Sequence, residues 1–394
     1  MTLLQIDRAL YLFIVVAFMM AFPPLTLAAA EGQGEDKILI PPPPAIAATA
    51  HILLDANSGR VLAENNADSR LPPASLTKIM AVYVAFNELA KGHLQLEENV
   101  NVSPNAWRTP GSRMFIEVNK QVTVSELLHG VIIQSGNDAS VALAEHIAGD
   151  ESTFAEMMNQ QAARLGMTNS HFTNSMGLPN PEHYTSARDL GILTRALIKE
   201  YPEYYKWFSL KEFTYNKITQ RNRNKLLWSD ETVDGVKTGH TEEAGFCLVA
   251  SAVRDNMRLI SVAMGTQSER ARTAENRTLL NYGFRFYETH HLYKDHEPLK
   301  ETRVWKGDEK LLQLGLADDL YVTIPRRQYK DLKAVMNFDQ KIFAPVKAGD
   351  ALGSVNVSLA GEVIADQKLI ALSTIEKGNL FRRIYDAAIL LVKK

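Results

Sequence analysis

The sequence predicts an α+β protein: a helix-rich domain around an antiparallel sheet, then a small all-β domain and a C-terminal amphipathic helix. Three observations favour this class. Helical patterns dominate residues 75–200. Strand-like runs flank them at residues 51–64 and 233–264, so the sheet combines segments from both sides of the helical region. After residue 290, short alternating runs punctuated by glycine indicate strands without helices.

Helix signals are clearest in the first half of the chain. Thr123 and Glu126 form a capping box for a helix over residues 127–133, and Asn137 or Asp138 is expected to cap the helix after it. The remaining helices of this domain are expected at residues 139–148, 154–165, 187–200 and 269–286.

Strand signals precede and follow these helices. Two short apolar runs within residues 51–64, about a turn at Asn57-Ser58-Gly59, predict a hairpin. Further strands are expected at residues 234–239, 246–253, 258–264, 302–304, 321–324 and 333–336, and within 344–371.

Changes of pattern also predict the domain boundaries. We expect a proline-rich extended lead-in at residues 31–45, the helix-rich domain at 46–289, the β domain at 290–375 and the terminal helix at 376–394. The β domain carries no cluster of residues with catalytic chemistry.

The N-terminal segment has the pattern of a secretory signal peptide, which we assign to residues 1–30. Residues 9–22 are almost purely apolar after Arg8, and Ala28-Ala29-Ala30 offers a small-x-small cleavage site. The weakly basic flank leaves an uncleaved anchor as the alternative. No other stretch has the roughly 18 apolar residues needed to span a membrane, so we expect an exported protein.

The C-terminal tail indicates an amphipathic basic helix. Apolar residues recur at helical spacing, and positive charges stand at both ends of the helix: Leu380, Phe381, Ile384, Ala388 and Leu391, with Arg382, Arg383, Lys393 and Lys394. Such a helix is suited to lying in an anionic membrane surface. The alternative is a helix docked on its own domain.

Composition limits the classes of function. The chain has 394 residues, enough for two domains, and a formal net charge of −2 without a long basic block, which argues against a nucleic-acid partner. Cys247 is the single cysteine, which excludes an intrachain disulfide and a cysteine-based metal site. We expect it to be a buried small hydrophobe.

The segment Pro72-Pro73-Ala74-Ser75 opens a helix that is expected to be buried. Proline is tolerated at the first turn of a helix, and the apolar run Ile79–Phe86 follows, ending near Gly92. Lys78 lies one turn after Ser75 on the same face. An unpaired buried ammonium is costly, so Lys78 either snorkels out, is paired, or has a lowered pKa. A lysine with a lowered pKa beside a serine is a general base beside a nucleophile.

Three short motifs follow one another in the chain. They are Ser75-Leu-Thr-Lys78, Ser135-Gly-Asn137 and Lys237-Thr-Gly239, the last followed by His240. Ser-x-Asn is weak by itself, but the order and spacing together match the serine–lysine acyl-transfer set of penicillin-binding proteins and β-lactamases.

The chain resembles the low-molecular-mass penicillin-binding proteins, in particular D-alanyl-D-alanine carboxypeptidases of the 5/6 type. Besides the motifs, the segments at residues 133–139, 187–189, 222–224 and 233–240 look familial. The resemblance implies a β-lactamase/transpeptidase-like fold and removal of the terminal D-alanine from peptidoglycan stem peptides, which limits the substrate for cross-linking. It also implies acylation by β-lactams, no cofactor, and a peripheral position on the periplasmic face of the inner membrane. We expect no metal at His240, because no second histidine lies at ligand spacing and H-E-x-x-H is absent.

The resemblance also implies the catalytic roles. Ser75 would attack the carbonyl between the two D-alanines, and neutral Lys78 would take its proton. Ser135, held with Asn137, would relay a proton to the leaving amine. Lys237 would steady Ser135 and add positive charge.

Substrate-binding roles follow from the same family pattern. The backbone N–H groups of Ser75 and His240, with Gly239 before it, would form the oxyanion hole. Thr238 and Arg272 would hold the terminal carboxylate, although Arg270 is close in sequence, and Arg223 is a possible second contact. Surface salt bridges are the alternative role for each arginine.

Three other functions remain as alternatives. A β-lactamase of the same fold would need a glutamate for deacylation, and the loop over residues 169–186 holds only Glu182, in a different sequence context. A D,D-endopeptidase usually lacks the β domain. A non-catalytic wall-binding scaffold would not need an intact motif set.

Overall fold

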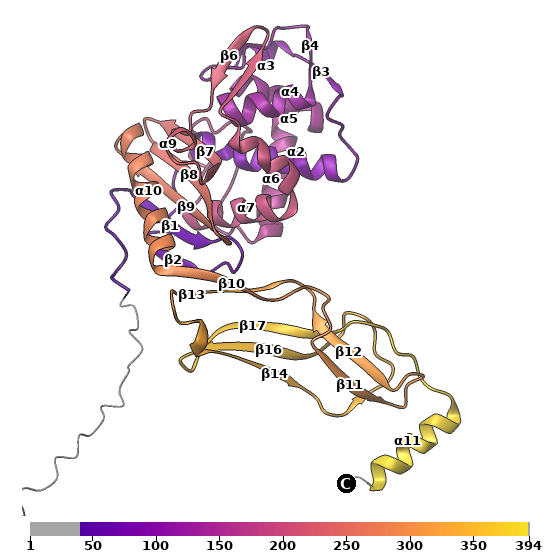
Figure 1. Cartoon of the computed structure of the whole chain (residues 1–394). Coiled ribbons are helices and arrows are strands. Elements are labelled where there is room, and N and C mark those ends of the chain that lie inside the picture. The colour runs from indigo at the N-terminus through magenta and orange to yellow at the C-terminus, as the bar shows by residue number, and fades with distance from the viewer. Residues whose placement is uncertain (1–39, 393–394) are drawn as a thin grey trace, which may run out of the picture. The chain divides into compact units, whose positions relative to one another are not determined.

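The computed structural model describes residues 40–392 (Figure 1). The expected signal peptide, most of the lead-in, Lys393 and Lys394 lie outside the described residues. Residues 40–45 have no regular secondary structure, in keeping with the extended lead-in expected there.

The first domain is built around a five-stranded antiparallel sheet with the order β2-β1-β9-β8-β7. The predicted hairpin and the strands that come after the helices meet in this sheet, as expected. Since β7 lies at the edge of this sheet, one side of its backbone has no strand partner among residues 40–392. The strands are β1 (Ala50–Asp55), β2 (Val61–Asn65), β7 (Val233–Thr241), β8 (Gly245–Arg254) and β9 (Met257–Thr266).

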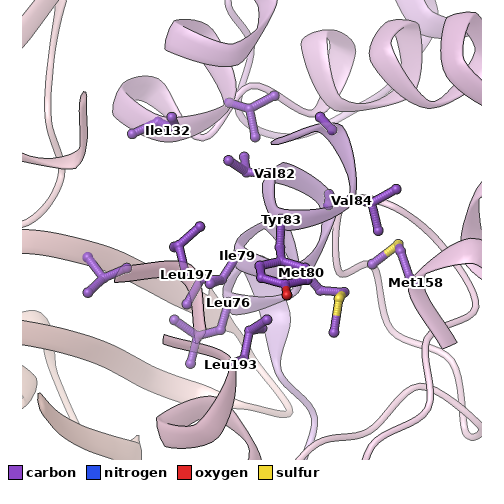
Figure 2. Packing of buried hydrophobic residues seen from close by; sticks show 14 of the residues in the cluster. Leu76, Ile79, Met80, Val82, Tyr83, Val84, Ile132, Met158, Leu193 and Leu197 are labelled. Carbon is purple, nitrogen blue, oxygen red and sulfur yellow. The ribbon is translucent and has the colours of Figure 1, made fainter. Parts of the chain in front are cut away.

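Helices account for most of the chain between β2 and β7. Helix α2 is buried over most of its length, which explains why its sequence lacks a polar face. Figure 2 shows Leu76, Ile79 and Met80 packed among side chains such as Leu193 and Leu197. The long helices are α2 (Thr77–Ala90), α4 (Val124–His129), α5 (Asn137–Ala148), α6 (Glu151–Leu165), α7 (Ala187–Glu200) and α10 (Glu269–Phe286).

The helix caps confirm one prediction and correct another. Thr123 and Glu126 form the predicted capping box of α4, which continues as a π-helix over Gly130–Gln134. The N-cap of α5 is Gly136, and neither Asn137 nor Asp138 caps the helix. Their side chains bind elsewhere in the site instead, so tertiary contacts override the local capping preference.

Short elements between the helices were not predicted. They are too brief for a periodic pattern, and their positions depend on contacts with the rest of the domain. They comprise β3 (Asn99–Asn101), α3 (Pro104–Arg108), β4 (Gln121–Thr123), α8 (Pro202–Tyr205), η3 (Lys206–Ser209), β5 (Glu212–Tyr215), β6 (Ile218–Arg221) and α9 (Leu226–Ser229).

The remaining strands form the expected all-β region. Strand β10 (Tyr287–Tyr293) pairs with β13 (Leu320–Pro325), so residue 290 falls inside this strand. A six-stranded sheet has the order β14-β16-β17-β12-β11-β15. Its strands are β11 (Lys300–Trp305), β12 (Leu311–Leu316), β14 (Leu332–Phe338), β15 (Ile342–Phe343), β16 (Ala351–Leu359) and β17 (Glu362–Ala371).

The terminal helix α11 (Leu380–Val392) is amphipathic as predicted. Its large apolar side chains, Phe381 and Leu391 among them, are exposed. Asp386 is buried and accepts hydrogen bonds from Arg303 (2.9 Å) and from the backbone N–H of Lys306 (2.7 Å). Among residues 40–392, no helix combines the length and apolar character that crossing a membrane requires.

Candidate active site

Ser75 lies in the short 3-10 turn η1 (Ala74–Leu76), directly before α2, at the position that the two prolines indicated. Lys78, one turn later, is fully buried. Its Nζ lies 3.1 Å from Ser75 Oγ, 2.8 Å from Asn137 Oδ1 and 2.7 Å from the carbonyl oxygen of Met176. The first two motifs therefore meet at one amine, and the snorkelling alternative for Lys78 is excluded.

The acceptors around Lys78 orient its lone pair. Asn137 Oδ1 and the Met176 carbonyl accept hydrogen bonds and have no proton to donate. They occupy two N–H groups of the neutral amine, so the lone pair is left to face Ser75 Oγ. This is the geometry that a general base needs to take the hydroxyl proton.

Burial, and next the positive charge of Arg223, lower the pKa of Lys78 to about 7, while the charges of Asp138 and Glu151 act in the opposite direction. A substantial fraction of Lys78 is therefore uncharged at neutral pH. The general base predicted from the sequence is available without any change of conformation.

Ser135 and Asn137 come from the junction between the π-helix and α5. Ser135 has a left-handed backbone (φ 66°), and its buried Oγ has no hydrogen-bond partner within the described residues. Asn137 donates from Nδ2 to the Pro110 carbonyl at 2.6 Å. A Cβ at Gly111 would lie 2.7 Å from that Nδ2, so a glycine is required for this close approach.

Asp138 is a site residue whose role sequence reasoning missed. Its buried carboxylate accepts from the backbone N–H groups of Met114 (2.8 Å), Phe115 (2.9 Å) and Ile116 (3.3 Å). These bonds fix the loop beside Asn137. Its position directly after the Ser-Gly-Asn motif is the only sequence signal for this role, and the same position also suggested a helix cap.

The third motif lies on the edge strand β7, next to the nucleophile. A Cβ at Gly239 would lie 2.9 Å from the Pro73 carbonyl oxygen and 3.2 Å from Leu76 Cγ, so glycine lets the strand approach the Ser75 turn. Thr238 on the same strand is buried and lines the cavity beside Ser75.

Lys237 is almost fully buried on β7. Burial, followed by the charges of Lys78 and of two arginines, holds its pKa well below the usual value. Its Nζ is 3.4 Å from the Thr238 carbonyl. Within residues 40–392, Lys237 makes no hydrogen bond to Ser135, whose buried Oγ has no partner.

Arg272 of α10 lies inside the site. It is buried, its Nη1 donates to the Gly239 carbonyl at 3.1 Å, and its Nη2 lies 3.5 Å from Glu269. Arg223 is at the exposed rim of the cavity, whereas Arg270 is exposed and does not line it. These positions favour Arg272 over Arg270 for contact with a substrate.

Two side chains of β8 flank the third motif. The His240 ring stacks on Phe246 with centroids 3.9 Å apart. Cys247 is fully buried, as predicted, and burial raises the pKa of its thiol to about 11.

A cavity of about 600 Å³ joins these groups. Lys78 and Lys237 are buried beneath it, and the other predicted residues line its wall: Ser75, Ser135, Asn137, Arg223, Thr238, Gly239, His240 and Arg272. A serine with a neutral amine at its hydroxyl, in a cavity lined by Arg223 and Arg272, can transfer an acyl group from an anionic substrate.

Comparison with known proteins agrees with this chemistry. Two family models match: "D-alanyl-D-alanine carboxypeptidase" over residues 38–268, and "Penicillin-binding protein 5, C-terminal domain" over residues 287–377. The chain is 44% identical over 378 residues to D-alanyl-D-alanine carboxypeptidase DacC of Escherichia coli, covering 94% of this chain and 92% of the relative. It is 41% identical to DacA of Haemophilus influenzae, covering 96% and 97%.

Solved structures show the same likeness. Penicillin-binding protein 5 from Haemophilus influenzae superposes with a TM-score of 0.80 at 42% identity, covering 85% of this chain and 99% of that one. Penicillin-binding protein D2 from Listeria monocytogenes, in its cefotaxime-bound form, has a TM-score of 0.57 at 28% identity over 62% of this chain and all of its own.

Proposed function

The chain belongs to the D-alanyl-D-alanine carboxypeptidase family, and from this premise we propose that it removes the terminal D-alanine of peptidoglycan pentapeptides through an acyl-enzyme on Ser75. It is a serine hydrolase of the penicillin-binding type. The observation that carries the assignment of the nucleophile is the contact of Lys78 Nζ with Ser75 Oγ, with both hydrogens of the neutral amine held by two other acceptors.

In the proposed acylation, Ser75 Oγ attacks the carbonyl carbon of the D-alanyl-D-alanine amide, and its proton passes to the lone pair of Lys78. The backbone N–H groups of Ser75 and His240 stabilise the oxyanion. The C–N bond then breaks as Ser135 passes its proton to the leaving nitrogen and takes up the proton held by Lys78, so D-alanine departs and Lys78 is neutral again. The unpartnered Oγ of Ser135 supports this relay, because it is free to bind the leaving amine.

Water completes the cycle. It attacks the ester carbonyl, Lys78 takes the water proton, and the proton returns to Ser75 Oγ as the ester C–O bond breaks. Glu182, the glutamate considered for a β-lactamase, is exposed and does not line the cavity. The lactamase alternative therefore lacks its expected deacylating group.

The cations that line the cavity, Arg223 and Arg272, support a proposed preference for a free terminal carboxylate. Arg272 and Thr238 are proposed to bind it, with Arg223 at the rim and Lys237 beneath. The carboxylate of a β-lactam would use the same groups, which is consistent with the cefotaxime-bound relative.

We expect the purified protein to release D-alanine from a soluble pentapeptide ending in D-Ala-D-Ala. The same peptide with a C-terminal amide should react at least about tenfold more slowly, because charge-assisted hydrogen bonds to the carboxylate are lost. The measurement is the rate of D-alanine or D-alaninamide release. Equal rates for both peptides contradict the assigned carboxylate site, and faster cleavage of a cross-linked dimer favours the endopeptidase alternative.

The terminal helix supports a proposal of peripheral attachment to the outer face of the cell membrane. Its apolar side chains Leu380, Phe381, Ile384 and Leu391 are exposed beside Arg382 and Arg383. Deleting residues 378–394 is expected to move the protein from vesicles of anionic phospholipid to the soluble fraction, with peptide turnover changed less than twofold. Sedimentation with such vesicles measures this, and unchanged sedimentation rules out the anchor.

A further inference from the structure

A buried histidine connects the loop over Asn169–Ser186 to the nucleophile helix. His183 is almost fully buried, and its Nε2 lies 2.7 Å from Oγ1 of Thr77. Thr77 is the first residue of α2 and directly precedes Lys78 in the sequence. Its Nδ1 lies 3.0 Å from the backbone nitrogen of Thr173. The three motifs do not include this residue.

The partners of the ring determine its tautomer. A backbone N–H can only donate, so Nδ1 of His183 accepts from Thr173 and carries no proton. The proton is then on Nε2, which donates to Thr77 Oγ1. Burial, and to a lesser degree the charge of His171, lowers the pKa of His183 to about 4, so this neutral form persists at neutral pH.

The segment that His183 binds through Thr173 includes Met176, whose carbonyl oxygen accepts a hydrogen bond from Lys78. Asn174 Oδ1 accepts from the backbone N–H groups of Gly177 (2.7 Å) and Leu178 (3.1 Å), which folds the segment into a tight turn. A Cβ at Gly177 would overlap the Ala74 carbonyl oxygen, so this turn packs directly on the nucleophile turn. Met176, within it, holds Lys78 Nζ through its carbonyl.

We propose that His183 is a positioning residue: by joining Thr173 to Thr77, it holds the Met176 carbonyl against Lys78 and so keeps the amine lone pair directed at Ser75. The inference rests on the proposed acyl-enzyme function. It concerns the proton-transfer step, because no atom of His183 lines the substrate cavity. Its loss should therefore slow acylation and leave non-covalent binding of the carboxylate unchanged.

Two side-chain replacements separate the two hydrogen bonds of the ring. His183→Asn keeps an acceptor near the Nδ1 position for Thr173 but cannot reach Thr77. His183→Gln keeps a donor near the Nε2 position for Thr77. Thr77→Val removes the same bond from the other side at almost constant volume. His171→Asn is the matched control, since the side-chain contacts of His171 within the described residues are with the Glu182 carbonyl and the Tyr184 ring of the same loop.

The test measures the rate at which a chromogenic β-lactam acylates the full chain. Each rate is divided by the concentration of active sites, which is determined by titration with labelled penicillin. His183→Asn and Thr77→Val should each lower the first-order acylation constant about tenfold, with the dissociation constant of the initial complex changed less than twofold. The double variant should be no slower than either single one, because both remove one bond. His183→Gln, which keeps the bond to Thr77 but lacks the acceptor for Thr173, should recover only part of the rate, and His171→Asn should match the unaltered protein.

Other outcomes overturn the inference. If Thr77→Val acylates at the unaltered rate, the His183–Thr77 bond does not position Lys78, and this variant decides the matter even if His183→Asn fails to fold. Additive losses in the double variant, or a change confined to the dissociation constant, also contradict it. Absence of acylation in the unaltered protein is a different failure, that of the proposed function.

Discussion

Replacing Ser75 by alanine is expected to lower D-alanine release by roughly four to six orders of magnitude and to abolish covalent labelling by penicillin. The oxygen that forms the ester is removed, and within the described cavity no second hydroxyl contacts Lys78. The fold should persist, because Ser75 caps no helix through its side chain. Release from the pentapeptide and peptide mapping of the labelled protein measure the two effects.

The matched control is Ser354→Ala. Ser354 fits the Ser-x-Asn pattern of the second motif but lies on β16 of the β domain, where its hydroxyl donates to Asn356. The Ser354→Ala protein should be labelled by penicillin and should release D-alanine at the rate of the unaltered protein. Label retained at another residue of the Ser75→Ala protein would falsify the assignment of the nucleophile.

Replacing Lys78 by methionine is expected to slow acylation by about two to four orders of magnitude. Methionine preserves the apolar stem but removes the base, and it leaves Asn137 Oδ1 and the Met176 carbonyl without their donor. Each orphaned acceptor costs about 1–3 kcal/mol of stability, offset by no longer burying an amine. The first-order rate of acylation and the midpoint of thermal unfolding are the measurements.

The pH dependence identifies the role of Lys78. Because its pKa is lowered to about 7, the amine is charged below that pH and cannot accept a proton, so acylation of the unaltered protein should fall as pH drops through about 7. This decrease of the acylation rate at low pH should be absent from the residual activity of Lys78→Met. Lys206→Met, at an exposed lysine paired with Glu203, should keep it. A decrease that persists in the Lys78 variant assigns the titration to another group.

The order of strands and helices was accessible from local patterns. The hairpin about Asn57-Ser58-Gly59, the capping box at Thr123 and the helix at residues 269–286 all appear where their sequence signals lie. Each depends on interactions between residues near one another in the chain, which composition and spacing encode directly. The capping of α5 was wrong because Asn137 and Asp138 have partners distant in sequence.

The side chains of the site were likewise accessible, because each motif combines residue types with a definite chemistry. The distances among these side chains could not be predicted from the sequence. Gly239 shows why: its role appears only when β7 is seen against the turn that holds Ser75, a contact between segments more than 150 residues apart in the sequence.

The sequence by itself predicted the class of fold and the family, and it pointed to Ser75 and Lys78 as the proposed nucleophile and base, since these predictions depend on side-chain chemistry and short-range periodicity. Only the tertiary structure showed how the amine of Lys78, the proposed base, is oriented toward Ser75. The Met176 carbonyl that holds Lys78, and the His183 that we propose holds the carbonyl in turn, act through a backbone atom and a long-range contact. A carbonyl group is present at every residue, so its function depends on where folding leaves it.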